Sequence, residues 1–408
     1  MQKARHGYKL VNWNYGKEIE IPDEWEIKKL KDVFDLKQGT YLDSFQTASG
    51  KFKIYGANGV IGYSNQYMHE DRTVLVSCRG EYCGATHFTD RFSWVSNNSI
   101  ALIPKKKNEL EPNFFYHFLK NSKFYADITG SAQPQIVVNV LQNKKIIFPI
   151  LKEQQKIASI LSNIDSLISQ TQKIIEQTQR LKKGLMQKLL TRGIGHTEFK
   201  KVNLGKPFLT VKIPKAWTVE PFKKILSVQQ NSIDLMDSQK YVRITVKRRH
   251  DGIVLRDEVY GKQILTENQF RINAGEFIIS RRQIIHNACG LVPKQFDGAV
   301  VSNEYSIFSG TRQLDINYFD YFSQTDLFHK TIVLTTHGVH IEKYILLLDE
   351  WLNLKMPLPP IDEQKRITRS ITVVEKKLLA NLQFESHLKN LKKGLMQKLL
   401  TGQMRVKV

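Results

Sequence analysis

Two long stretches of the chain repeat their apolar residues at the spacing of an amphipathic helix. In residues 151–193 these are Ile157, Ile160, Leu161, Ile164, Leu167, Ile168, Ile174, Ile175, Leu181, Leu185 and Leu189, and in residues 361–402 they are Ile367, Ile371, Val374, Leu378, Phe384, Leu388, Leu391, Leu395 and Leu399. Spacings of three and four positions are typical of helices with heptad character. The pattern therefore predicts two helices of about 39 residues, each roughly 58 Å long at 1.5 Å per residue.

Ahead of each helix the pattern changes to short β-type runs that glycine, asparagine and aspartate interrupt. The predicted strands lie at 52–55, 60–63, 73–77, 99–103, 241–246, 276–280 and 306–308. Short helices are predicted at 112–121 and 317–328, whereas residues 6–20 are polar and predict a loop. This mixture predicts two globular segments of mixed α/β structure.

The chain is also a tandem repeat. The eleven residues Leu-Lys-Lys-Gly-Leu-Met-Gln-Lys-Leu-Leu-Thr occupy positions 181–191 and return unchanged at 391–401. The other residues that align at the same offset of 210 include Pro149 with Pro359, Glu153 with Glu363, Gln154 with Gln364 and Ile157 with Ile367. The pattern Ile-Pro-x-x-Trp begins at residue 21 and again at residue 213. The two helical stretches are similar in sequence, whereas the two globular segments differ. This favours a common framework that holds two domains for the recognition of different targets.

These observations predict an α+β fold, built as a pseudo-twofold tandem repeat of globules and long helices. The expected parts are an N-terminal segment at 1–20, a first globular domain at 21–150, a helical spacer at 151–193, a linker at 194–212, a second globular domain at 213–360, a second helical spacer at 361–402 and a C-terminal tail at 403–408.

Four residues of the helices are candidates for helix packing. Gly184 and Gly394 each cost about 1 kcal/mol inside a helix, yet both copies carry one. Close approach of two helix backbones is the favoured reason, and a local kink is the alternative. Thr171 and Asn381 fall at the same heptad position, where a polar side chain in an apolar seam is expected to fix the pairing register.

The chain is strongly basic, because 61 basic residues against 39 acidic ones give a net charge of +22 and a pI near 9.7. Such an excess favours a polyanionic partner, most often nucleic acid. An anionic membrane surface is disfavoured because the basic residues are spread along the chain. No apolar run approaches the roughly 18 residues of a membrane span, so we expect a soluble, cytoplasmic protein. Three cysteines indicate no disulfide framework.

No pattern in the sequence predicts catalysis. Pro22-Asp23 with Glu26 and Lys28 resembles a metal-dependent nuclease signature, but the spacing is too tight. Cys78, Cys83 and His87 lack a fourth zinc ligand and are better interpreted as buried structural residues. Neither a Gly-x-x-x-x-Gly-Lys-Ser/Thr phosphate loop nor a motif for methylation of a base amino group is present. We therefore expect no catalytic residue, metal or cofactor in this chain.

The remaining candidate chemistry is DNA contact. Arginine and glutamine read guanine and adenine edges through paired hydrogen bonds, and lysine suits phosphates. The candidates in the first globule, expected in loops between strands, are Lys37, Gln38, Asn58, Arg79 and Tyr82. The candidates in the second globule are Lys247, Arg248, Arg249, Arg281, Arg282 and Gln283. A solvated charged hairpin remains an alternative for any one of these residues.

The arrangement resembles the specificity subunit of type I restriction-modification systems, in which two target recognition domains alternate with two conserved helical regions. The residues that carry the resemblance are the two Ile-Pro-x-x-Trp motifs, Gly130-Ser-Ala-Gln-Pro134 leading to Pro149 and Glu153-Gln154, Pro359-Pro360 with Glu363-Gln364, and the two eleven-residue repeats. The resemblance covers essentially the whole chain. One departure is that Trp217 and Pro359 lie 142 positions apart, against 124 for Trp25 and Pro149. The second segment also lacks the Gln-Pro of the first, so its contacts cannot be transferred from it.

The resemblance implies a mechanism without catalysis in this chain. Each recognition domain would read one half of a bipartite site in double-stranded DNA, and the two helices would pack as an antiparallel coiled coil that acts as a spacer. Two methyltransferase subunits that use S-adenosylmethionine would dock on the helices, and motor-nuclease subunits that use ATP and magnesium would complete the complex. The alternative is a non-catalytic coiled-coil adaptor whose basic globules bind RNA or another acidic partner. The motif of methylated adenines in the genome, with and without this gene, would discriminate between the two.

Overall fold

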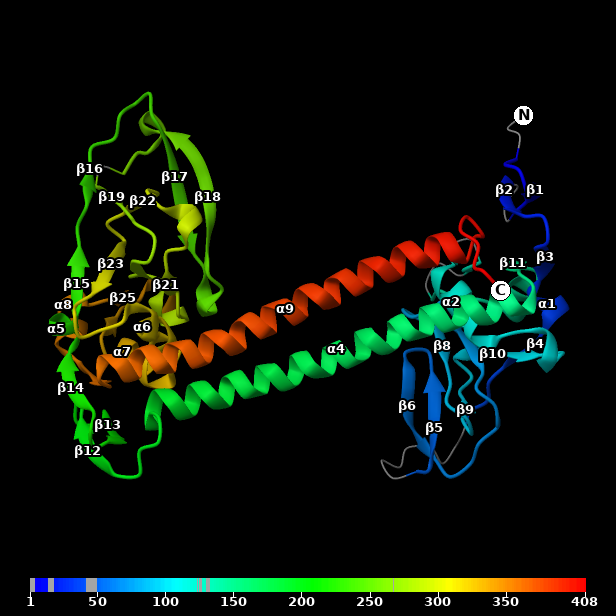
Figure 1. Ribbon diagram of the computed structural model, residues 1–408, viewed down its shortest axis with the longest axis horizontal. Coiled ribbons are helices and arrows are strands. Elements are labelled where there is room, and N and C mark those ends of the chain that lie inside the picture. Colours follow the sequence, from blue (N-terminus) through cyan, green and yellow to red (C-terminus); the bar gives the residue numbers. More distant parts are fainter. Residues whose placement is uncertain are drawn as a thin grey trace. The chain divides into compact units, whose positions relative to one another are not determined.

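The computed structural model describes residues 4–13, 18–41, 50–122, 124, 127–129, 133–266 and 268–408. It forms two compact units (Figure 1). Unit 1 comprises Met1–Ile174 together with Asn381–Val408, and unit 2 comprises Ile175–Ala380. Residues 130–132 of the Gly-Ser-Ala-Gln-Pro segment lie outside the described residues. Each unit therefore contains one globular segment and a part of each long helix.

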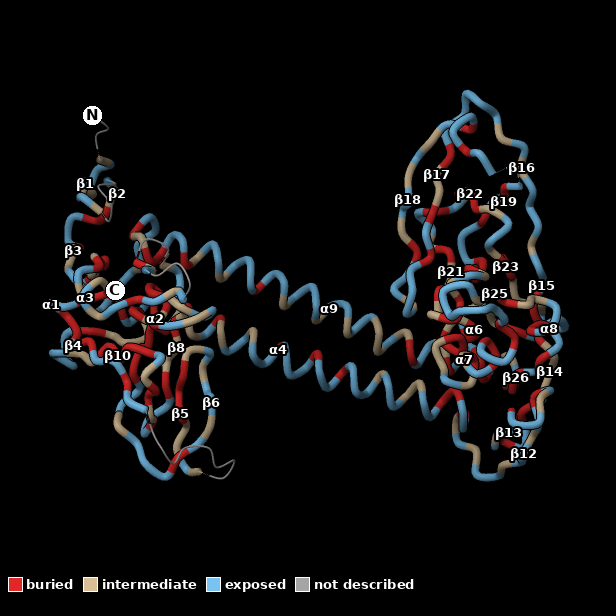
Figure 2. Tube along the Cα trace, turned by 180° about the vertical axis from the view of Figure 1, so that it is seen from behind, coloured by how far each residue is buried: buried red, intermediate tan, exposed pale blue. Residues whose placement is uncertain are grey.

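The two long helices have the predicted extents. Helix α4 covers Leu151–Arg192, which is 42 residues, and α9 covers Ile361–Leu399, which is 39 residues. Figure 2 shows exposed residues along most of both helices, with buried positions recurring between them. Within the described part of the chain, no helix is both long and apolar enough to cross a membrane.

In unit 1 the segments of α4 and α9 run antiparallel. The ammonium of Lys392 on α9 pairs with the carboxylate of Asp165 on α4. Further along α4, the amide of Gln172 donates to Glu385 at 2.8 Å. The contact residues ascend along α4 while they descend along α9, so these helix segments have opposite directions.

Unit 1 is built on two small sheets. Its elements are β1 (Tyr8–Asn12), β2 (Glu18–Pro22), β3 (Glu26–Lys29), α1 (Leu30–Val33), β4 (Phe34–Gln38), β5 (Phe52–Gly56), β6 (Gly59–Ser64), β7 (Val74–Ser77), β8 (Thr86–Phe88), β9 (Trp94–Val95), β10 (Ser99–Pro104), η2 (Lys107–Glu109), α2 (Pro112–Asn121), α3 (Val138–Gln142) and β11 (Lys145–Phe148). An antiparallel four-stranded sheet has the order β4-β10-β7-β8, and a three-stranded sheet has the order β6-β5-β9. The four predicted strands and the helix at 112–121 are confirmed.

Unit 2 repeats this plan with additional elements. They are β12 (Phe199–Asn203), β13 (Thr210–Pro214), β14 (Thr218–Pro221), α5 (Phe222–Ile225), β15 (Leu226–Gln229), β16 (Ser232–Ile233), β17 (Lys240–Val246), η3 (Arg248–His250), β18 (Ile253–Tyr260), η4 (Gly261–Gln263), β19 (Gln269–Arg271), β20 (Phe277–Ser280), η5 (Ile284–His286), β21 (Cys289–Leu291), η6 (Lys294–Phe296), β22 (Val300–Ser302), β23 (Tyr305–Gly310), α6 (Ile316–Ser323), α7 (Asp326–Val333), β24 (Thr336–His337), η7 (Ile341–Lys343), β25 (Ile345–Leu346), α8 (Leu348–Asn353) and β26 (Lys355–Leu358). The sheet order β15-β23-β20-β21 reproduces that of β4-β10-β7-β8. The second sheet is larger, with five strands in the order β16-β19-β22-β17-β18, and accommodates much of the extra length of this segment.

Two local predictions were wrong. Residues 8–12 and 18–20 of the predicted loop form strands, because β1 pairs antiparallel with β2, as β12 does with β13 in unit 2. Residues 14–17 lie outside the described residues. These short strands are half-exposed and polar, so their sequence resembles that of a loop. The helix predicted at 317–328 is two helices, because the side chain of Thr325 accepts a hydrogen bond from the amide of Phe328 and caps the start of α7.

Each Ile-Pro-x-x-Trp motif is anchored to the start of the following long helix. In unit 1 the buried indole of Trp25 donates to Glu153, whose carboxylate also accepts from Arg405 at 2.7 Å. In unit 2 the indole of Trp217 donates to Glu363 at 3.1 Å, and His196 bonds the same carboxylate at 2.9 Å. A buried carboxylate needs such partners to remain charged. The residues that define the motif therefore fix each globule to a helix N-terminus.

The prediction of helix packing through glycine was wrong. A Cβ added at Gly184 or at Gly394 would meet no neighbouring heavy atom within 4 Å, so neither glycine is required by a close backbone approach. The predicted register role of Thr171 and Asn381 stays a prediction. The hydroxyl of Thr171 bonds its own helix at Leu167, and the amide nitrogen of Asn381 has no partner among the described residues.

Candidate nucleic-acid interface

In unit 1 several candidate side chains gather where β4 and β7 end. Gln38, the last residue of β4, donates to the backbone oxygen of Asn97 at 2.6 Å. Arg79 follows the end of β7, and Asn58 lies in the turn between β5 and β6. That turn is held at the same edge because the hydroxyl of Ser77 donates at 2.6 Å to the carbonyl that precedes Asn58. The structure therefore brings Gln38, Asn58 and Arg79 to one edge of the sheet.

The other two candidates of unit 1 are placed differently. Lys37 and Gln38 are neighbours in β4, not loop residues as predicted, so their side chains leave opposite faces of the strand. Burial, followed by the nearby ammonium of Lys37, lowers the pKa of His69. Tyr82 lies in the turn between β7 and β8 and is 42% exposed.

In unit 2 two separate candidate segments meet. Arg248 in η3 donates from Nε to the side-chain oxygen of Gln283, which follows β20, at 2.8 Å. A terminal nitrogen of Arg248 donates at 2.8 Å to Glu342. Lys247 pairs with Asp251 at 3.5 Å. The fold thus brings Arg248 and Gln283, candidates from two separate segments, into direct contact.

Three more arginines surround this pair. Arg249 is exposed and has a φ of +61°, a left-handed conformation that is uncommon for residues other than glycine. Arg282 pairs with Glu304 at 2.7 Å. Arg281 is half-buried, and its Nε has no hydrogen-bond partner among the described residues. Four arginines, Arg248, Arg249, Arg281 and Arg282, therefore lie in the two segments that meet here.

Sequence reasoning missed the acids of this surface. Glu304 and Glu342 orient Arg282 and Arg248, but both acids are distant in sequence from the arginine runs. Glu342 lies 94 positions from Arg248. No local pattern signals such a pair, because it arises from the fold.

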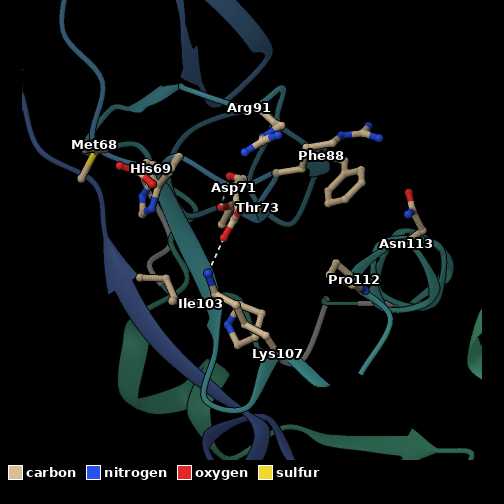
Figure 3. Close-up of a pocket in the computed structure, with 13 residues that line it drawn as sticks. Met68, His69, Asp71, Thr73, Phe88, Arg91, Ile103, Lys107, Pro112 and Asn113 are labelled. Atoms are coloured by element: carbon tan, nitrogen blue, oxygen red, sulfur yellow. Dashed lines mark hydrogen bonds and ion pairs between the residues drawn. The ribbon is translucent and has the colours of Figure 1, made fainter. Parts of the chain in front are cut away.

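A pocket of about 650 Å³ lies at the opposite end of the four-stranded sheet of unit 1 (Figure 3). Its walls include Thr73, Phe88, Ile103 and an ion pair between Lys107 and Asp71. Thr73 precedes β7, and Phe88 and Ile103 lie in the last residues of β8 and β10. Because Gln38 and Arg79 lie at the other strand ends, the pocket is not part of the candidate DNA edge.

Cys78 and Cys289 are buried free thiols, and Cys83 is half-buried. Burial raises the pKa of the Cys78 and Cys83 thiols, and His87 bonds the carbonyl of Ala57 at 2.9 Å. Burial raises the pKa of Cys289 still more strongly. Protonated thiols are poor metal ligands and poor nucleophiles. Within the described residues, no group of three or more His, Cys, Asp or Glu side chains is arranged to hold a metal ion.

Comparisons with known proteins agree with these observations. Residues 22–180 match the family model described as type I restriction modification DNA specificity domain. The chain is 25% identical over 434 positions to the type I restriction enzyme MjaVIII specificity subunit of Methanocaldococcus jannaschii, covering 98% of this chain and 97% of that protein. A putative type I restriction enzyme MjaX specificity subunit of the same organism is 25% identical over 446 positions, covering 98% of both proteins.

A solved structure shares the fold. The crystal structure of the type I restriction-modification system S subunit from M. genitalium matches with a TM-score of 0.61 at 16% identity, covering 92% of this chain and 96% of that one. The duplicated fold places arginine and glutamine candidates at strand ends in both units. Residues 22–180 thus carry a type I restriction modification DNA specificity domain, and the chain over nearly its whole length is similar to specificity subunits of type I restriction enzymes. Its function is DNA sequence specificity, and the comparisons give no support to the RNA-adaptor alternative.

Proposed function

We propose that each unit reads one half of a bipartite DNA site. The observation that carries this proposal is that Arg79 and Arg282 stand at equivalent places in the two units, each two residues past the end of an equivalent strand, β7 or β20. The backbone agrees, because the amide of Cys78 bonds the carbonyl of Asn98 at 2.9 Å, and the amide of Arg281 bonds that of Glu304 at the same distance. One framework thus presents different side chains around a shared arginine.

The proposed contacts follow the chemistry of these side chains. Arg248 and Gln283 are suited to guanine and adenine edges in the major groove, and Arg79 and Gln38 supply the same two side-chain types in unit 1. Lys247 and Arg249 are suited to phosphates, which position the protein without reading sequence. The net charge of +22 supports this, because each neutralised phosphate adds salt-dependent affinity.

We further propose that residues 151–193 and 361–402 form an antiparallel coiled coil that spaces the recognition domains at 21–150 and 213–360. The antiparallel contacts of unit 1 support this, as does the ion pair of Lys182 with Glu375 in unit 2, at 2.6 Å. The positions of all three contact pairs add to 557: 165 with 392, 172 with 385, and 182 with 375. A constant total is what a single antiparallel register gives.

Two copies of a methyltransferase subunit are proposed to dock on these helices. In unit 1 Leu167, Ile174, Phe384 and Leu391 are 43–50% exposed, although apolar side chains on a solvated helix gain stability from cover. Leu391 has an identical counterpart in Leu181, which is 54% exposed. An exposed leucine at the same place in both repeats suits two copies of one partner.

The catalytic parts are assigned to partner subunits. S-adenosylmethionine would be bound by the methyltransferase, and ATP and magnesium by the motor-nuclease subunits. The proposed role of this chain is recognition in the cytoplasm without catalysis. The purified chain, given magnesium, ATP and S-adenosylmethionine, should neither cleave nor methylate DNA. Activity that survives removal of all partner subunits and disappears on Asp23→Ala would instead support the nuclease alternative.

A domain exchange tests the proposed reading of half-sites. Residues 26–148 would be replaced by the corresponding segment of another family member, and the methylated motif would be determined with partner subunits present. We expect one half of the motif to change and the other half to persist. A change in both halves would show that the units do not read independently.

A further inference from the structure

A polar cluster joins the globule of unit 1 to both long helices. His117 on α2 bonds the hydroxyl of Ser162 on α4 at 3.4 Å, and its Nδ1 lies 3.9 Å from the carboxylate of Asp165 on the same helix. The ammonium of Lys392 on α9 pairs with that carboxylate. The cluster therefore links three elements, one of which comes from the other repeat.

Unit 2 contains the same cluster with different side chains. The hydroxyl of Tyr321 on α6 contacts Thr372 at 3.0 Å and donates to Glu375 at 2.5 Å, both on α9. Lys182 on α4 pairs with Glu375 at 2.6 Å. We call these two clusters the clasps: His117, Ser162, Asp165 and Lys392 in unit 1, and Tyr321, Thr372, Glu375 and Lys182 in unit 2.

The clasps are equivalent by sequence as well as by geometry. Ser162 with Thr372, Asp165 with Glu375, and Lys182 with Lys392 are all related by the offset of 210. The two lysines occupy the same place in the eleven-residue repeat. Each serves the globule of the opposite repeat, since Lys392 closes the clasp of the first globule and Lys182 closes that of the second.

The clasp lies far enough along each helix to constrain the angle between the globule and the helix. Each globule is already anchored at its helix start, through Glu153 in unit 1 and Glu363 in unit 2. Asp165 and Glu375 each lie twelve residues further on, which is about 18 Å at 1.5 Å per residue. The apolar core also packs on this stretch, through Leu161 in unit 1 and Ile371 in unit 2. The clasp extends the attachment beyond the core and thereby constrains the angle between globule and helix.

The two clasp lysines are shielded from water, so their ion pairs should contribute more than those of fully exposed side chains. The Lys392 side chain is 12% exposed and that of Lys182 is 25% exposed, although their acids are about one-third exposed. Exposed pairs typically contribute at most about 1 kcal/mol, and shielding from water strengthens the attraction. In contrast, the next lysines of the repeat, Lys183 and Lys393, are exposed and make no ion pair among those of the described residues.

We propose that Lys392 and Lys182 are positioning residues for DNA recognition, which hold each globule at a fixed angle on the helices and thereby select the number of bases between the half-sites. This inference rests on the proposed reading of two half-sites. It explains why an otherwise solvent-facing segment keeps a lysine at this position in both copies.

The test uses the full complex with methyltransferase subunits. The DNA substrates keep both half-sequences and vary only the spacer length by one base at a time. The parent complex should methylate one spacer length preferentially. Lys392→Met and Lys182→Met should methylate spacers one base longer or shorter to within about threefold of the preferred one, with the half-sequences unchanged. Lys393→Met and Lys183→Met are the matched controls and should retain the parent preference.

A conservative variant separates positioning from loss of folding. Lys392→Arg keeps a cation that can reach Asp165 and should restore the parent spacer preference, and melting curves of all variants should be similar. If the parent is selective and both methionine variants are equally selective, the positioning role is overturned while the proposed function stands. A parent complex that ignores spacer length would overturn the proposed half-site reading, and the inference with it.

Discussion

The side chains at the candidate DNA edge of unit 2 are oriented by acids. Arg248 is held between Gln283 and Glu342, and Arg282 is held by Glu304. Each acid lowers the local positive potential while it fixes the direction of a guanidinium group. For the proposed contacts with DNA, this arrangement lowers the non-specific attraction to phosphates and gives the guanidinium groups a defined direction toward base edges.

Glu342→Gln should therefore weaken the discrimination between cognate and unrelated DNA without weakening the binding of DNA. Removal of one negative charge beside Arg248 should raise the affinity for unrelated duplex DNA several-fold at low salt, because DNA no longer competes with the carboxylate. The ratio of specific to non-specific affinity should fall. Binding titrations with cognate and scrambled duplexes measure both quantities. Glu350→Gln, at an exposed position of α8, is the control and should leave the ratio unchanged.

Asp320, on the clasp helix α6, predicts a pH dependence of stability. Burial, followed by repulsion from Glu375, raises the pKa of this carboxyl from 3.8 to about 6. The folded state therefore holds the proton more tightly than the unfolded state does. The contribution of Asp320 to stability is fully present below about pH 4, falls as pH rises from about 4 to about 6 and is constant above that, with a total loss of about 2–3 kcal/mol.

Asp320→Asn should remove this loss. Its melting temperature should exceed that of the parent at pH 8, and the difference should vanish near pH 4, where the aspartic acid is already neutral. Melting curves collected between pH 4 and pH 8 measure the effect. A variant whose advantage is the same at both pH values would show that packing rather than charge is responsible.

At the scale of elements, the helices with a periodic apolar pattern could be predicted from the sequence, whereas the elements that depend on polar side chains could not. The heptad pattern predicted both long helices closely, because an apolar seam leaves a repeat in the sequence. The break between α6 and α7 was missed, since Thr325 acts through a cap that a periodic apolar pattern conceals. The contact of Arg248 with Gln283 was also beyond prediction, although both residues were candidates, because only the sheet brings them together.

The repeated glycines of the long helices give a prediction at the same scale. Gly184→Ala and Gly394→Ala add a methyl group into open space, so each should stabilise its helix by about 0.5–1 kcal/mol. If the glycines are kept for the docking of a partner, the same variants should bind methyltransferase subunits more weakly. Chemical denaturation measures the first effect, and titration with the partner measures the second. A loss of stability would instead favour the local kink.

At the scale of the whole molecule, the helices are expected to act as a ruler. An insertion after Thr191 would lie beyond Leu189 and Leu190, which unit 2 buries, so the informative sites follow Ile174 in α4 and Ala380 in α9. Four added residues in each helix give about 6 Å of length and about 40° of rotation beyond a full turn. One base pair of duplex DNA advances by roughly 3.4 Å and turns by about 35°.

The methylated motif of this insertion variant should keep both half-sequences and gain one or two unspecified bases. Sequencing of methylated adenines in cells that express the complex gives the result. An unchanged spacer with retained activity would mean that the helices do not set the distance. Altered half-sequences would mean that the helices also shape the recognition surfaces.

Unit 1 combines two segments that lie far apart in the sequence, which affects how it folds during synthesis. Its core includes Met396, Leu399 and Leu400, and Arg405 neutralises the buried Glu153, although the rest of the unit lies before residue 175. Unit 2 is one uninterrupted segment and can fold while synthesis continues. The first globule cannot complete its core until residues 396–405 have been synthesised, so deletion of this segment should unfold the globule formed by the early part of the sequence.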